Sequence, residues 1–219
     1  PKVMDMLTQG RTAGVFQMES TGMTGVCMGL KPQSIEDLSI IVAAYRPGPM
    51  DSIPTYLRNR HEPDKISYKT PQLAHILDVT NGCIVYQEQV MQIFRELAGF
   101  SFGQADNVRR AMSKKKHAVM EAEREHFVHG CTEPGHECPG CVANGISEKV
   151  ANEIYDEMSS FASYAFNKSH AACYAYVAFQ TAYLKCHYPS EFMAALLTSV
   201  LDNTGKVIEY SGECARLGI

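Results

Sequence analysis

A polar insert, Asn167-Lys168-Ser169-His170, lies directly before the longest apolar run of the chain, Ala171–Phe179. The small and aromatic residues of that run predict a buried helix, and polar groups are costly to bury without partners, so packing alone does not explain the insert. Asn167 or Ser169 is a favourable N-cap, and a helix start that carries a cation is a geometry that binds anions. The residues alone also allow a simpler interpretation, a capped helix whose Lys168 reaches solvent.

The composition is that of an ordinary globular protein, with 45% hydrophobic and 20% charged residues. A chain of 219 residues can bury a core as one large domain or two small ones. Its longest apolar run is too short to span a bilayer, and the start at Pro1-Lys2 has no signal-peptide pattern. Because it begins with Pro and ends in mid-pattern at Leu217-Gly218-Ile219, we expect a piece of a longer protein.

The net charge of −4 means that any contact with nucleic acid must come from a local basic patch. Of eight Cys, five are scattered through helical or apolar contexts: Cys27, Cys83, Cys173, Cys186 and Cys214. This distribution is typical of reduced thiols and predicts a cytoplasmic protein.

Helix signals dominate the chain. Ser34-Ile35-Glu36-Asp37 resembles a capping box, and the helix that follows must end near Arg46 because Pro47-Gly48-Pro49 forbids continuation. Gly99 is a C-cap candidate for a second helix. Apolar stripes and a proline predict further helices, through Val90–Leu97, Val150–Phe161 and Ser169–His187, and one with Pro189 in its first turn.

Strand candidates are few, namely 14–17 and 83–86, so the predicted fold class is mainly α with minor β. Loops concentrate at 46–54, 61–71 and 130–146, and the last is the best internal boundary.

The densest basic segment combines five cations with one nearby acid, Asp106: Arg109, Arg110, Lys114, Lys115 and Lys116. On a helix that continues from Phe102, Arg110 and Lys114 lie one turn apart and present donors toward phosphates. A solvated helix C-terminus, whose Lys residues favour the macrodipole, explains the same residues equally simply.

Arg46 is a second candidate, because the rigid turn Pro47-Gly48-Pro49 restricts where its guanidinium can go. An ordinary helix stop followed by a solvent-exposed Arg is the alternative.

A third candidate is Cys131-x6-Cys138-Pro-Gly-Cys141, with His136 between the cysteines and His129 just before them. Cys-x-x-Cys is the spacing of a zinc half-site, and Cys131 plus His136 or His129 would complete a four-ligand structural zinc site. No second half-site follows, so an ordinary insertion with reduced thiols stays open, whereas a redox motif lacks the βαβ pattern around it.

Signatures of a complete active site are missing. The chain has no P-loop, no dinucleotide-binding glycine pattern, no nucleophile elbow, and no Asp-x-Asp pair for two magnesium ions. Its basic segments occur without the carboxylates that phosphoryl transfer needs. The chain therefore contains only the cationic half of such an active site.

Six stretches together resemble the C family of DNA polymerases, the bacterial replicative DNA polymerase III alpha subunits. They run in family order from about residue 10 to the end: Gly14–Met23, Tyr45–Met50, Val85–Ile93, Ala105–Lys116, Phe166–Ala171, and Gln180–Lys185 with Tyr188–Met193. Each stretch is weak by itself, but all six in register are specific.

The resemblance implies a fingers domain, and the palm, whose aspartates hold magnesium, would lie upstream. It implies that fingers cations bind the triphosphate of the incoming deoxynucleotide (dNTP). The residues carried over by motif are Arg46, Arg109, Arg110, Lys114, Lys168 and His170, with Tyr164 and Asn167 shaping the nucleotide pocket. Lys115 and Lys116 are expected to contact the DNA backbone or solvent. No family role transfers to the Cys-rich segment.

The sequence therefore predicts a mainly helical fingers domain in two parts, 1–130 and 147–219, joined by a Cys-rich loop at 131–146. Its expected partners are primer-template DNA, dNTP, and the remaining polymerase and replisome, including a sliding clamp bound through other regions; no membrane contact is expected. By itself the chain should be inactive. Two rival functions are a noncatalytic nucleic-acid-binding module, with Arg109–Lys116 as its footprint, and a zinc-dependent enzyme or zinc-stapled domain built on Cys131–Cys141.

Overall fold

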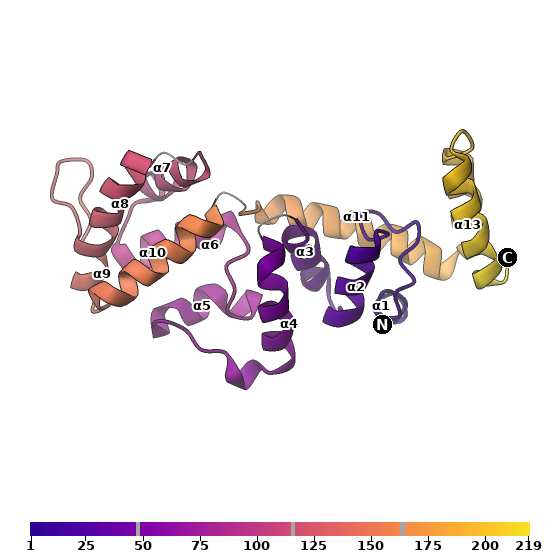
Figure 1. Cartoon of the computed structure of the whole chain (residues 1–219), viewed down its shortest axis with the longest axis horizontal. Helices are drawn as coiled ribbons and strands as arrows, with labels where there is room; N and C mark the ends of the chain where they lie inside the picture. Colours follow the sequence, from indigo (N-terminus) through magenta and orange to yellow (C-terminus); the bar gives the residue numbers. More distant parts are fainter. Residues whose placement is uncertain (47–48, 115–116, 163–164) are drawn as a thin grey trace. The chain divides into compact units, whose positions relative to one another are not determined.

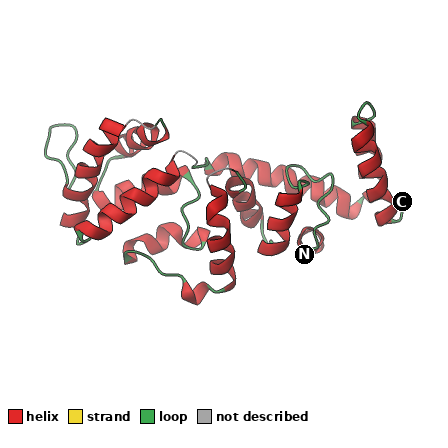
Figure 2. Cartoon of the chain, in the orientation of Figure 1, coloured by secondary structure: helices red, strands yellow, loops and turns green. Residues whose placement is uncertain are grey.

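The computed structural model describes residues 1–46, 49–114, 117–162 and 165–219, with the backbone alone at 117 and 162. Helices joined by loops make up these residues (Figures 1 and 2). They form two compact units, one of residues 1–45 and 169–219 and the other of residues 46–168. The predicted mainly α class is confirmed.

The first unit, of residues 1–45 and 169–219, contains six helices: α1 (Lys2–Thr8), α2 (Thr21–Leu30), α3 (Ile35–Ala44), α11 (Lys168–His187), α12 (Pro189–Ser199) and α13 (Thr204–Leu217). α11 has only its first residue in the other unit. The capping box is confirmed, because the Ser34 hydroxyl accepts from the Asp37 N–H and the Asp37 carboxylate accepts from the Ser34 N–H. Pro189 opens α12, as predicted.

The second unit, of residues 46–168, holds the other helices: α4 (Ile53–His61), α5 (Ala74–Leu77), α6 (Gln87–Ala98), α7 (Phe102–Ser113), α8 (His117–His129), α9 (Gly140–Ala143) and α10 (Glu148–Ala162). Short 3₁₀ turns lie at Pro49–Ser52, Pro63–Lys65, Pro71–Leu73 and Asp78–Thr80. Gly99 ends α6 with a left-handed φ of 77°, so the predicted C-cap is confirmed.

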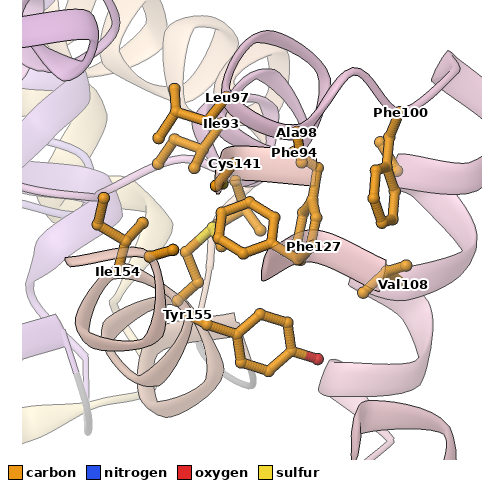
Figure 3. Packing of buried hydrophobic residues seen from close by; sticks show 14 of the residues in the cluster. Ile93, Phe94, Leu97, Ala98, Phe100, Val108, Phe127, Cys141, Ile154 and Tyr155 are labelled. Atoms are coloured by element: carbon orange, nitrogen blue, oxygen red, sulfur yellow. The ribbon is translucent and has the colours of Figure 1, made fainter. Parts of the chain in front are cut away.

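An aromatic cluster lies at the centre of the second unit (Figure 3). The ring of Phe94 lies 5.0 Å from Phe127 and 6.0 Å from Tyr155, and Phe127 lies 5.7 Å from Tyr155. These rings come from α6, α8 and α10, and all three are buried. Edge-on contacts of this kind add to the hydrophobic gain and fix the three helices against one another.

A buried lysine organises the first unit. The side chain of Lys185 in α11 is fully buried, and its ammonium donates to the backbone oxygens of Arg11 and Ala13 and to the Glu213 carboxylate in α13, at 3.1, 2.8 and 2.6 Å. Three acceptors compensate the loss of water around the charge. One side chain thus joins the loop after α1 to two helices.

The segment 14–17, predicted as a strand, is a series of turns. Gly14 and Gln17 have φ values of 73° and 55°, which no strand contains. The Gly14 N–H donates to the Glu19 carboxylate, which also accepts from the Tyr210 hydroxyl and the Lys206 ammonium of α13. These bonds hold the segment against α13.

β structure in the described residues is limited to two isolated bridges, Tyr86 with Phe166 (parallel) and Cys131 with Cys138 (antiparallel). The predicted strand at 83–86 is thus reduced to one bridging residue. No described helix combines the length and the apolar character that crossing a bilayer requires.

Candidate functional site

The Phe166–Lys168 stretch is held by a segment far away in sequence. Around the bridge of Tyr86 with Phe166, the Phe166 N–H donates to the Val85 oxygen at 3.3 Å, and the Gln87 N–H donates to the Phe166 oxygen at 2.9 Å. The Gln87 side-chain amide also donates to the Ala165 oxygen at 2.9 Å. Two of the motifs singled out in the sequence therefore form one structure within the second unit.

The Gln89 side chain holds the backbone at Val85 and Tyr86. Its side-chain oxygen accepts from the Val85 and Tyr86 N–H groups at 2.9 and 3.0 Å, and its amide nitrogen donates to the Ile76 oxygen and the Thr80 hydroxyl. The buried amide is thereby fully partnered. Sequence reasoning gave Gln89 no role, although a Gln at the third position of a helix is half of a capping box.

Glu88 fixes the start of α11. Its carboxylate accepts from the backbone N–H of Lys168 at 3.0 and 3.2 Å and from the Asn167 side-chain amide at 2.9 Å. A carboxylate at a helix N-terminus satisfies a donor and complements the helix dipole. Asn167 directly precedes Lys168, the first residue of α11, so it stands at the N-cap position expected for it, whereas Ser169 lies inside the helix. The Lys168 N–H, expected as a phosphate donor, is already bound to Glu88.

Two of the predicted cations lie against the bridged aromatic residues. The guanidinium carbon of Arg46 is 3.9 Å from the centroid of the Phe166 ring, and the Lys168 ammonium is 5.7 Å from that of Tyr86. Cation–π contacts of this kind restrain a long side chain without neutralising its charge. Arg46 is half-buried, which lowers its pKa, whereas Lys168 is exposed. The structure thus places Arg46 and Lys168 against the rings of the two residues that form the bridge.

The basic segment is partly neutralised. Asp106 accepts from Arg109 at 2.7 and 3.0 Å and pairs with Arg110 at 2.7 Å, and the hydrogen bonds from Arg109 hold the pKa of the Asp106 carboxyl below its usual value. The Arg109 side chain is 17% exposed and that of Arg110 66% exposed, so only Arg110 projects mainly into solvent. Lys114 is exposed at the end of α7.

A surface pocket of about 490 Å³ lies between α6 and α7. It brings Asn167 together with Arg109, and both acids that bind these groups, Glu88 and Asp106, also line it. The remaining lining residues are Gln87, Met91, Gln92, Arg95, Glu96 and Phe102. Arg46, Lys168, Arg110 and Lys114 are not among the lining residues, so the pocket unites only part of the predicted set.

The other predicted nucleotide-binding and DNA-binding residues are His170, Tyr164, Lys115 and Lys116. His170 belongs to the first unit, where its ring stacks on Tyr174 at 4.2 Å between centroids. Tyr164, Lys115 and Lys116 lie outside the described residues.

The structure does not support the predicted zinc site. Cys131 and Cys138 face each other in a short hairpin with two backbone hydrogen bonds of 2.9 Å, but Cys141 is buried in the hydrophobic core and His136 is exposed. Burial raises the pKa of the Cys141 thiol to about 12, and it also raises that of Cys138. Within the described ranges, no three His, Cys, Asp or Glu side chains are grouped so that they could hold a metal ion.

Residues 1–135 match the family described as the bacterial DNA polymerase III alpha subunit finger domain. The chain belongs to this family. Over its full length it is 47% identical to the DNA polymerase III subunit alpha of Thermus aquaticus and 43% identical to those of Staphylococcus aureus strains Mu50 and N315. The chain spans only 18–20% of the length of these relatives. The resemblance found in the sequence is therefore confirmed.

Proposed function

We propose that the chain is the part of a bacterial replicative DNA-directed DNA polymerase that binds the triphosphate of the incoming dNTP and the adjacent template strand. The observation that carries this proposal is the pairing of Arg46 and Lys168 with the two bridged aromatic residues, Phe166 and Tyr86. The bridge fixes the backbone from which the exposed Lys168 projects, and it places the Phe166 ring against which Arg46 lies.

Positioned cations are what this reaction requires of a finger domain. A triphosphate is highly charged, and further negative charge develops on the leaving pyrophosphate in the transition state. Arg binds two phosphate oxygens at once, whereas Lys acts as a mobile point charge. Lys168 and Arg46 are therefore assigned to the triphosphate. Asn167 and Arg109 are assigned to the pocket beside it.

Arg110, Lys114 and His170, and also Tyr164 outside the described residues, remain proposed nucleotide-binding residues. Lys115 and Lys116 remain proposed contacts to DNA. The contact with the wider replisome and its clamp is a proposal that follows from the family. The division into 1–130, 131–146 and 147–219 and the cytoplasmic location are proposals that follow from the loop composition and the cysteine distribution.

Magnesium ions would be held elsewhere. Two-metal catalysis needs carboxylates that hold two metal ions about 4 Å apart, and the described residues contain no group of acids able to hold an ion. The residues here do not fit the metal, and we assign it to palm aspartates outside this chain. The chain by itself is expected to bind and position without catalysing.

The test is nucleotide incorporation by the full-length polymerase that contains this chain, with Lys168→Ala compared against Lys149→Ala, an exposed lysine of α10. Lys168→Ala is expected to raise the apparent Kd for dNTP and to leave the Kd for primer-template unchanged, whereas Lys149→Ala changes neither. An unchanged dNTP dependence in Lys168→Ala would contradict the proposal.

A further inference from the structure

Helix α11 exposes an apolar face to solvent. We define the α11 outer face as the exposed residues of one side of the helix: Ala172, Cys173, Tyr176, Val177, Gln180, Tyr183 and Leu184. Tyr176 is 54% exposed, Tyr183 42% and Leu184 47%. The members recur at spacings of three and four residues, so they form one continuous stripe along the helix.

The opposite side of α11 is also apolar. Small residues, Ala171, Ala175, Ala178 and Ala182, are buried there, and the only Lys, Arg, Asp or Glu after Lys168 is the buried Lys185. A helix that is hydrophobic all round is typical of one covered on every side. Soluble proteins rarely leave a contiguous patch of large apolar side chains uncovered unless it is an interaction site.

The Tyr183 ring of this face is held between two neighbouring rings of α11. The ring centroid of Tyr183 is 6.4 Å from that of Phe179 and 4.3 Å from that of His187, one turn away on either side. Tyr188, directly after the helix, is 53% exposed and extends the surface. Restrained aromatic side chains lose little entropy on docking, which favours a stable contact.

Charge decides which partner fits. Nucleic-acid backbones are bound by Lys and Arg, and the α11 outer face has neither. About four-fifths of each relative's length lies outside the matched region. That part of a polymerase chain is available to cover this face, and charged residues are depleted at the cores of protein interfaces.

We propose that the α11 outer face is the docking surface for an uncharged apolar surface elsewhere in the same polymerase chain, outside these 219 residues. The inference rests on membership of the family and not on the proposed phosphate-binding role of Arg46 and Lys168. The proposal gives α11 two functions. The first residue of the helix is Lys168, and the α11 outer face attaches the helix to the remaining enzyme.

The test uses the full-length polymerase with p-benzoylphenylalanine, a photo-crosslinking analogue of Phe, in place of Tyr183, irradiated in the presence of primer-template DNA. Val79 is the matched control, since it is 61% exposed and lies in the other unit. The expected result is a crosslink within one polypeptide to a peptide outside residues 1–219, in higher yield than from position 79.

A crosslink to DNA, to a second polymerase copy or to residues 46–168 would overturn the proposal, and so would a yield no higher than at position 79. If the Tyr183 variant does not fold, the same replacement at Tyr176 makes the same prediction. The role of Lys168 in nucleotide binding is tested by a separate experiment, so a negative result in one experiment does not decide the other proposal.

Discussion

The Glu88 carboxylate accepts a hydrogen bond from the backbone N–H of Lys168, so a residue of α6 fixes where α11 begins. The same carboxylate binds the Asn167 side chain, and the preceding residues Tyr86 and Gln87 bond to Phe166. The backbone at Lys168 is therefore fixed by Glu88, and the backbone just before it is fixed at Phe166. We regard Glu88 as the residue that positions Lys168.

Replacing Glu88 with Ala is expected to lower the free energy of unfolding by about 1 kcal/mol, the usual cost of losing a side chain that caps a helix. The measurement is urea denaturation of the chain. Glu62→Ala is the control, because Glu62 pairs with the exposed Lys65 and such surface pairs contribute little. Equal effects of the two substitutions would show that Glu88 does not hold α11.

Lys185→Met is expected to destabilise the chain by about 3–5 kcal/mol, because it leaves Glu213 and two backbone oxygens buried without their ammonium partner. Thermal or urea unfolding measures the loss. Lys65→Met, at a side chain that is 73% exposed, should change stability by less than about 0.5 kcal/mol. If Lys185→Met is tolerated like Lys65→Met, the ammonium does not organise the first unit.

The stability of the chain is expected to depend on the ionisation of Glu19. Although burial alone raises it, the hydrogen bonds from Tyr210, Gly14 and Lys206 lower the pKa of Glu19 below its ordinary value of 4.5. A carboxyl with a depressed pKa in the folded state stabilises the fold above its unfolded pKa, and this contribution disappears as the pH falls through the folded pKa.

Glu19→Gln should therefore flatten the decline in unfolding free energy between about pH 5 and pH 3, relative to the unsubstituted chain. Denaturation curves at a series of pH values measure this slope. Parallel slopes in the two proteins would show that Glu19 does not contribute to it.

Local signals in the sequence predicted the helices that carry them. The capping box at Ser34, the C-cap at Gly99 and the first-turn proline at Pro189 all act between residues within one helical turn or so. Both partners of each such interaction therefore lie in one short stretch of sequence and can be recognised there. The mainly α class followed from these signals and from apolar periodicity.

Pairs that are distant in sequence were out of reach. The pairs Glu88 with Lys168 and Lys185 with Glu213 each depend on how separate helices pack. The sequence around one residue of such a pair does not indicate which distant residue is its partner. The strand predicted at 14–17 failed for the same reason. In the structure this segment forms turns, and hydrogen bonds from its backbone to the Glu19 carboxylate and the Thr181 hydroxyl hold them.

For the candidate site, the sequence offers residues but not the contacts that hold them. The motifs identified Arg46, Lys168 and Arg109, and the structure adds the acids Glu88 and Asp106 that bind the start of α11 and the arginines. The zinc prediction used spacing alone, and spacing does not show that Cys141 faces the core.

The central claim is that Arg46 and Lys168 act on the same triphosphate. A double-mutant cycle in the full-length polymerase tests it, with single-turnover incorporation measured against dNTP concentration for Arg46→Ala, Lys168→Ala and the double variant. Each single substitution should lower the efficiency of incorporation roughly 10- to 100-fold, as loss of a charged hydrogen bond does.

Residues that share one partner are coupled, so the double variant should depart from the product of the two single effects by about 0.5–3 kcal/mol. Strictly multiplicative losses, or no loss in either single variant, would contradict the claim.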